Sequence, residues 1–118
     1  MGEPVKEPPT EPLEFAGPEA LAAWLREHGA SAAELRVRLW KKATGRASVS
    51  WEECVLCALA VGWIDGQSRS EGPESWVQRL TPRRPRSLWS ARNVAHAERL
   101  IAEGLMTEAG LREVERAR

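Results

Sequence analysis

The chain has 118 residues, 42% hydrophobic and 29% charged, a composition typical of one ordinary globular domain. Its seventeen basic and seventeen acidic side chains cancel, so no overall field directs it to nucleic acid or to an anionic membrane. The sequence has no apolar signal segment and no stretch near the roughly 20 apolar residues that span a bilayer, so we expect a cytoplasmic protein.

The charges are unevenly distributed along the chain. Seven glutamates lie between Met1 and Glu34, against Lys6 and Arg26. From 79 to 99 the order is reversed, with six arginines and one glutamate. A local basic patch is therefore compatible with the neutral total. The alternative is that arginine replaces lysine throughout the chain, where they number fourteen and three, and that these runs are solvated faces.

The N-terminal part of the chain divides into a tail and a first helix. Glutamate and proline dominate residues 1–12, which favours a disordered, extended tail ahead of one domain spanning residues 13–118. Pro18 suits the first position of a helix, because its missing N–H has no partner there. Trp24 faces inward in this helix, and Gly29 ends it.

A strand and a second helix follow. Residues 35–40 alternate between aliphatic side chains and Arg36, Arg38 and Trp40, a period of two that predicts a half-buried strand. Ser50 and Glu53 have the spacing of a capping box, which predicts a helix from about Trp51 to Val61, with Gly62 after its end.

The second half of the sequence predicts a hairpin and two more helices. Residues 63–69 and 75–80 read as antiparallel strands around a Gly-Pro turn, and the prolines of 81–86 predict an irregular surface loop. Ser87 or Ser90 caps a helix to about Glu103, and Thr107 caps a last helix. The side chains expected on the inner side of the third helix are Ala91, Val94, Ala97 and Ile101. The predicted class is α+β, with a small antiparallel sheet of about three strands flanked by about four helices.

Four segments of the sequence resemble the YdeI/OmpD-associated (bacteriocin-protection) family. They are residues 39–42 (LWKK), 58–66 (ALAVGWIDG), 80–93 (LTPRRPRSLWSARN) and 100–111 (LIAEGLMTEAGL). The chain departs from the family pattern at Ala60 and Val61, where Cys-Phe is usual, and has no further helical segment after Arg118. The resemblance implies an α+β fold and an association with bacteriocin protection, or with a porin under envelope stress, but brings no catalytic residues.

The candidate site joins the hairpin to the proline-flanked arginines. Asp65 lies at an element edge, and Arg83 and Arg84 can meet a carboxylate or phosphate through paired donors. Tryptophan rings nearby can stack on arginine. The residues we expect at this site are Trp63, Asp65, Arg83, Arg84, Trp89, Ser90 and Asn93, with Trp76 beside them. The alternative is structural: Asp65 or a carbonyl group anchors the arginines and fixes the loop on the sheet.

Other chemistry is poorly represented in the sequence. Cys54 and Cys57 have redox-motif spacing, but they follow the first helical turn beside two glutamates, so we expect inert, buried thiols. His28 and His96 have no nucleophile motif near them. We expect no catalytic residue, no metal and no cofactor.

Three functions stay open from the sequence. The first is a non-enzymatic binding module whose Arg/Trp surface contacts a protein partner or a small anion. The second is an enzyme of unknown reaction with a polar cleft at Asp65, Arg83, Arg84 and Asn93. The third is nucleic-acid binding through the last two helices, which Glu108, Glu113 and Glu115 disfavour. The sequence leaves the oligomeric state open.

Overall fold

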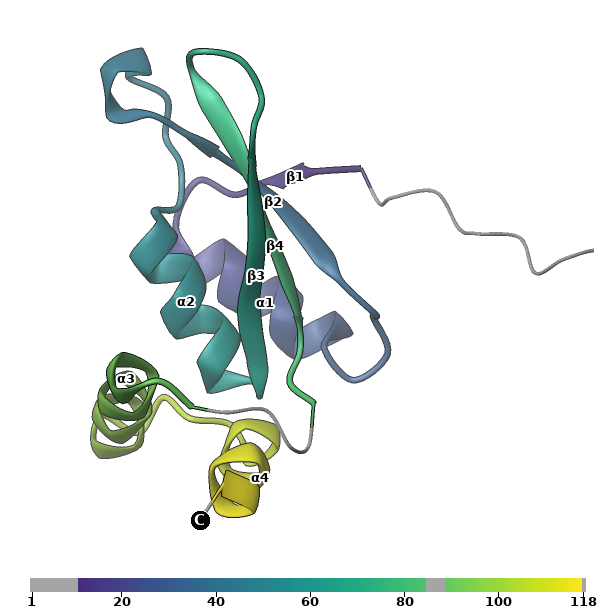
Figure 1. The fold of residues 1–118 in the computed structure, drawn as a ribbon, viewed down its shortest axis with the longest axis vertical. Coiled ribbons are helices and arrows are strands. Elements are labelled where there is room, and N and C mark those ends of the chain that lie inside the picture. The colour runs from purple at the N-terminus through teal and green to yellow at the C-terminus, as the bar shows by residue number, and fades with distance from the viewer. Residues whose placement is uncertain (1–10, 85–88, 118) are drawn as a thin grey trace, which may run out of the picture.

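The computed structural model describes residues 11–84 and 89–117, and it confirms the α+β class (Figure 1). Residues 1–10 of the expected tail 1–12 and residues 85–88, including Ser87, lie outside the described residues. The elements in chain order are β1 (Leu13–Glu14), α1 (Pro18–His28), β2 (Leu35–Trp40), the 3-10 helix η1 (Lys42–Thr44), α2 (Trp51–Ala60), β3 (Trp63–Ser70), β4 (Ser75–Pro82), α3 (Ala91–Ala102) and α4 (Glu108–Ala117).

The sheet has four strands in the order β1-β2-β4-β3. The hairpin β3–β4 and the pair β2–β4 are antiparallel, as expected, but β1 is parallel to β2, so the sheet is mixed. The expectation of about three antiparallel strands was therefore one strand short. A strand of two residues is too short to show a period of two, and only its pairing with β2 identifies it.

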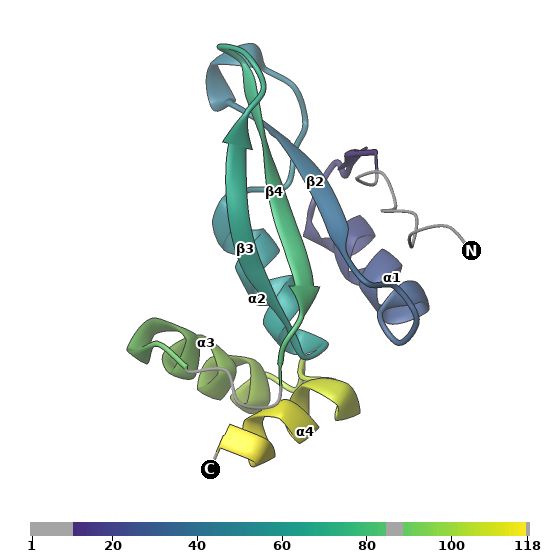
Figure 2. The same ribbon diagram turned by 45° about the vertical axis from the view of Figure 1, so that its right-hand side comes forward.

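Helices α1 and α2 cover one face of the sheet (Figures 1 and 2). The alternating aliphatic side chains of β2 point to this face, which buries them against both helices and Trp63. The buried side chains of this cluster are Leu21, Leu25, Leu35, Val37, Leu39, Val49, Cys54, Ala58, Trp63 and Leu80. The arginines that alternate with the β2 aliphatics therefore lie on the opposite face.

The predicted caps of α2 are confirmed. Ser50 accepts a hydrogen bond from the Glu53 amide at 3.1 Å, and the Glu53 carboxylate accepts one from the Ser50 amide at 2.8 Å. Past the end of the helix, Gly62 has a φ of 81°, a left-handed conformation that glycine adopts without strain. The chain then turns directly into β3.

Strand β4 extends to Pro82, two residues further than the sequence predicted. The Arg83 amide donates to the Gly62 carbonyl at 3.0 Å, which makes Gly62 and Arg83 a hydrogen-bonded pair. Trp63 and Pro82 are the next partners in register, so they form a non-hydrogen-bonded pair, in which a proline loses no ladder bond. The irregular segment accordingly starts after Pro82.

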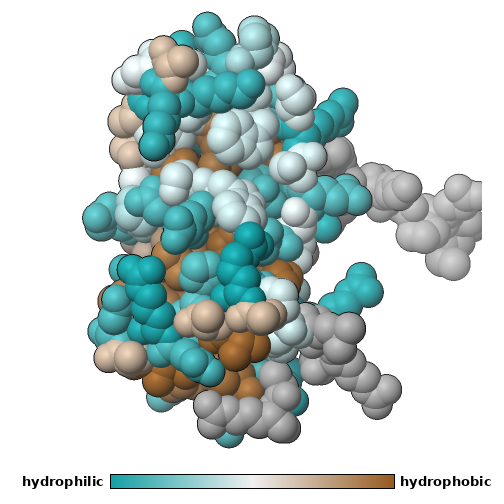
Figure 3. Space-filling model, turned by 60° about the vertical axis from the view of Figure 1, so that its left-hand side comes forward, coloured by the Kyte–Doolittle hydropathy of each residue, from teal (hydrophilic) through white to brown (hydrophobic). Residues whose placement is uncertain are grey.

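Helices α3 and α4 lie at one end of the sheet, beyond the end of α2 (Figure 2). The inward face of α3 carries Asn93, Ala97 and Leu100, and only Ala97 of the expected set is buried. Val94 and Ile101 are 40% and 38% exposed, and hydrophobic surface gathers over this end of the molecule (Figure 3). The helix has this rotation because Leu100 packs with Val55 and Leu59 of α2, contacts that the helical period alone does not specify.

Helix α4 is fastened to the end of α2 through one carbonyl group. The Thr107 hydroxyl and amide both donate to the Ala60 carbonyl, at 2.7 and 2.9 Å. The same hydroxyl caps α4, as predicted, by accepting from the Gly110 amide at 3.2 Å. No helix among the described residues is long and apolar enough to cross a bilayer.

Candidate functional site

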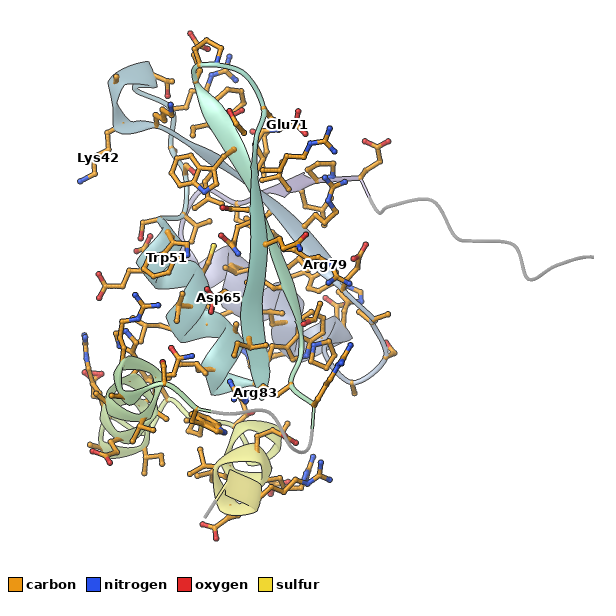
Figure 4. The ribbon with its side chains drawn as sticks, viewed as in Figure 1. Lys42, Trp51, Asp65, Glu71, Arg79 and Arg83 are labelled. Atoms are coloured by element: carbon orange, nitrogen blue, oxygen red, sulfur yellow. The ribbon has the colours of Figure 1, made fainter. Side chains whose placement is uncertain are left out.

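Arg83 is the centre of the polar cluster that the sequence predicted. Its side chain is 6% exposed, and its guanidinium carbon lies 4.0 Å from the centre of the Trp89 ring. Figure 4 places it at the end of the sheet, close to α3 and α4. A guanidinium stacked on an indole face and withdrawn from water is held by electrostatic attraction to the ring. The structure thus brings Arg83 and Trp89 together.

Two carboxylates act on the Arg83 charge. Burial lowers the pKa of the guanidinium, whereas Glu113 of α4 and Asp65 of β3 raise it. Asp65 is half-buried and is the register partner of Leu80, so it points to the face that α2 covers. Asp65 and Arg83, which the sequence predicted to lie together, therefore interact electrostatically. Glu113 also acts on the Arg83 charge, and the sequence did not suggest it as a site residue.

Some of the other predicted site residues are buried or cap a helix, and others are exposed. Trp63 is 1% exposed, and its indole N–H donates to the Gly29 carbonyl at 3.2 Å. Ser90 caps α3 by accepting from the Asn93 amide at 3.1 Å. Asn93 is buried, and Arg84 is exposed. Trp76 lies at the opposite end of β4, beside Ser70, so it is not part of this cluster.

The chemistry of this cluster favours anchoring over catalysis. The Arg83 amide donates to the Gly62 carbonyl and the guanidinium lies over the Trp89 ring, while Asp65 and Glu113 stabilise its charge electrostatically. Among the described residues, the Asn93 Oδ1 is buried without a hydrogen-bond partner. The described residues include no group of three or more His, Cys, Asp or Glu that could hold a metal ion.

A second candidate site lies on the sheet face opposite α1 and α2. Register partners share a face, so Arg36 and Arg79 form one row of this face, and Arg38, Val77 and Arg69 form the next. Val77 is only 2% exposed. The aliphatic stems of long arginine side chains cover apolar surface in this way while their charged ends stay in water. We call Arg36, Arg38, Arg69 and Arg79, together with Trp40, the arginine face.

Trp40 and Arg46 extend this face toward the turn at its end. The guanidinium carbons of Arg46 and Arg38 lie 4.0 and 5.8 Å from the Trp40 ring centre. The Trp40 indole N–H donates to the Glu14 carboxylate at 2.8 Å. An arginine stacked on a ring keeps its N–H donors directed outward, where they can meet a carboxylate or phosphate.

Two glutamates partly balance the arginine face. Glu34 pairs with Arg79 at 2.7 Å, and Glu14 pairs with Arg38 at 4.0 Å. Exposed pairs of this kind contribute at most about 1 kcal/mol to stability. Five arginines, including Arg46, outnumber these two carboxylates even when Glu71 and Glu74 of the turn after β3 are added, so the surface keeps a positive excess. It therefore suits an anionic ligand.

The alternating pattern of residues 35–40 indicates part of this face, although none of its residues belongs to the site predicted from the sequence. The alternation of Arg36, Arg38 and Trp40 predicts a half-buried strand, and the same alternation places these three side chains together on its polar side. Arg69 and Arg79 join it only through the register of β3 and β4, and residues so far apart in the chain show no common motif.

The cysteines form no redox site. Both thiols are free, Cys54 is buried and Cys57 half-buried. Burial, followed by the neighbouring Cys57, raises the pKa of Cys54 to about 12, and burial with Glu53 raises that of Cys57 to about 11. Thiols with raised pKa values are poor nucleophiles at neutral pH, which fits the prediction of inert thiols, whereas the predicted burial holds for Cys54 only.

Fold and face together define an α+β domain with helices on one side of a mixed sheet and an arginine-rich surface on the other. The family model described as Domain of unknown function (DUF8412) matches residues 13–113, so the chain belongs to this family. No curated protein and no solved structure matches the chain significantly.

Proposed function

We propose that this protein is a non-enzymatic binding module whose arginine face binds an acidic protein partner or a small anion. The observation that carries the proposal is the direct cross-strand pairing of Arg36 with Arg79. Like charges opposite each other cost a sheet stability, and the ion pair of Arg79 with Glu34 offsets part of that cost. An anion that lies between them would remove that repulsion.

The cluster around Arg83 supports the proposal indirectly, because a residue that is only 6% exposed offers little surface to a ligand. Its guanidinium lies over Trp89 and interacts electrostatically with Glu113 and Asp65, an arrangement that fits the structural alternative predicted from the sequence. Membership of the YdeI/OmpD-associated family stays a prediction, and under it the bound partner would belong to bacteriocin or envelope-stress protection. The enzyme and nucleic-acid alternatives also stay predictions.

The test measures binding of fluorescent poly-glutamate and of inorganic phosphate to the whole chain and to two matched double variants. Arg36→Gln with Arg79→Gln removes two charges from the arginine face. Arg26→Gln with Arg112→Gln removes two charges from exposed positions on α1 and α4. Both pairs keep a long polar side chain.

We expect the first double variant to lose about tenfold or more in affinity for the anionic probe, and the second to bind like the wild type. Binding to the wild type should weaken as salt is raised, because the charges are exposed. Equal losses in the two variants would show that only net charge matters and would overturn the proposal.

A further inference from the structure

Strand β3 is a free edge of the sheet. It pairs with β4 on one side, and among residues 11–84 and 89–117 no strand pairs with its other side. Five consecutive residues at its end, 66–70, are exposed. An edge of this kind presents main-chain N–H and C=O groups to a further strand.

One backbone hydrogen bond determines which groups of Ser68 and Ser70 point outward. In the second half of the hairpin the Glu71 amide donates to the Ser75 carbonyl at 3.0 Å, so Glu71 and Ser75 are a hydrogen-bonded pair. Hydrogen-bonded and non-hydrogen-bonded pairs alternate along an antiparallel ladder. Ser70 and Ser68 therefore belong to non-hydrogen-bonded pairs with β4, and their N–H and C=O groups point to the free edge.

A bulge limits how much of this edge is regular. The register shifts between Asp65 and Ser68, and the side chain of Gln78 donates to the Gly66 carbonyl at 2.8 Å within the irregular stretch. Regular pairing along the outer side of β3 can therefore begin at Ser68. The regular segment from Ser68 to Ser70 includes Arg69, whose side chain points to the arginine face.

Within the described part of the chain, the β3 edge is the one border of the arginine face that carries a basic residue and no acidic one. Acidic residues border the other three sides: Glu14 on β1, Glu34 before β2, and Glu71 and Glu74 in the turn between β3 and β4 (Figure 4 labels Glu71). Arg69 is exposed and forms no ion pair with a described residue. An anionic chain meets repulsion at three borders and attraction at the fourth.

We propose that an extended acidic segment of a partner protein adds to the sheet at the Ser68–Ser70 edge, with alternate acidic side chains on the arginine face. This proposal rests on the proposed function and specifies the class of partner and its mode of binding. Main-chain hydrogen bonds to Ser68 and Ser70 would supply affinity, and the acidic side chain opposite Arg69 would supply selectivity.

A nucleic acid fits the same face less well. Base recognition on such surfaces uses stacking on free aromatic rings, and the Trp40 ring already carries Arg46 at 4.0 Å. A phosphate backbone also continues beyond the face in both directions, where it would meet the glutamates of the border. An acidic strand can end at the border and pair with the edge.

The probe is a fluorescent peptide of about seven residues, the usual length of a strand, in which threonine and glutamate alternate. Its control has the same sequence with N-methylated threonine amides. Threonines opposite Ser68 and Ser70 would make the main-chain bonds, and a glutamate would face Arg69. The control therefore keeps every charge and loses the donors. We expect the methylated peptide to bind about tenfold more weakly, because each methyl group removes a hydrogen-bond donor and also keeps the peptide away from the strand edge.

Amide hydrogen exchange followed by NMR tests the position without any change to the protein. Saturating probe should slow exchange at the Ser68 and Ser70 amides, because both donors become bonded. Unchanged exchange at both amides with the probe bound would overturn the edge proposal.

Variants separate this proposal from the proposed function. Ser68→Pro removes an outward donor and leaves the charge unchanged, and Ser68→Ala is its matched control. We expect about tenfold weaker binding for the first and wild-type binding for the second, with thermal melting to verify that both fold. If Ser68→Pro folds and binds normally while the Arg36/Arg79 double variant fails to bind, the edge proposal fails and the proposed function stands. If that double variant also binds normally, both fail.

Discussion

Arg36 on β2 and Arg79 on β4 lie directly opposite each other on the sheet face away from α1 and α2, and Glu34 reaches Arg79 at 2.7 Å. The Glu34 carboxylate therefore neutralises part of the charge of this cross-strand arginine pair. A cross-strand pair of two arginines stabilises a sheet less than a neutral pair or a pair of opposite charges. The proposed binding surface rests on this relationship.

Replacing Arg36 with glutamine should leave the free energy of unfolding unchanged or raise it by up to about 0.5 kcal/mol, because the like charge opposite Arg79 in the register disappears. Urea denaturation measures the change, and any gain should shrink in about 1 M salt, where the screening length is short. Arg69→Gln is the control, since Arg69 lies opposite Val77. A clear loss of stability for Arg36→Gln alone would contradict the repulsion.

Charge reversal should have different effects on stability at the two neighbouring arginines after β4. Arg83→Glu would place a carboxylate in a buried site that already holds Asp65 and Glu113, and we expect a loss of about 3 kcal/mol or more in unfolding free energy. Arg84→Glu is the matched change at an exposed position and should stay within about 0.5 kcal/mol of the wild type. Similar melting curves for the two variants would argue against the anchoring role of Arg83.

A methyl group at Gly110 should disturb the attachment of α4. Its Cβ would meet the Ala60 carbonyl and the Met106 sulfur, and the carbonyl also accepts the Thr107 bonds, so it cannot move freely. We expect Gly110→Ala to cost about 1–3 kcal/mol, although alanine is the better helix former. Thermal unfolding checks this, with Arg112→Ala on the exposed side of α4 as control. A stabilised Gly110→Ala would mean that α4 and α2 do not approach so closely.

The thiols should make the protein sensitive to alkali. Burial raises the pKa of Cys54 from 9.0 to about 12 and that of Cys57 from 9.0 to about 11, so the folded state retains protons that the unfolded state loses. Stability from this source is complete below pH 9.0 and falls as the pH rises to about 12. Urea midpoints measured across this range should decrease, and Cys54→Ala should decrease less steeply. Rapid alkylation of the native protein at neutral pH would contradict the raised values.

Much of the fold follows from local pattern. The capping box at Ser50 and Glu53, the terminal glycine after α1 and the alternation in β2 each depend on residues a few positions apart, so short-range physics determines them. Where contacts from elsewhere in the chain intervene, the predictions failed. Strand β1 exists through its pairing with β2, and the rotation of α3 follows from Leu100 packing on α2.

The candidate site shows the same division. The sequence alone determined which residues could carry charge and stacking, including Arg83 with Trp89 and the polar side of β2. Only the tertiary structure decided that Arg83 is buried and that Arg36, Arg38, Arg69 and Arg79 share one face. Burial and strand register depend on contacts between distant segments, because the alternation within one strand leaves the identity of its neighbours open.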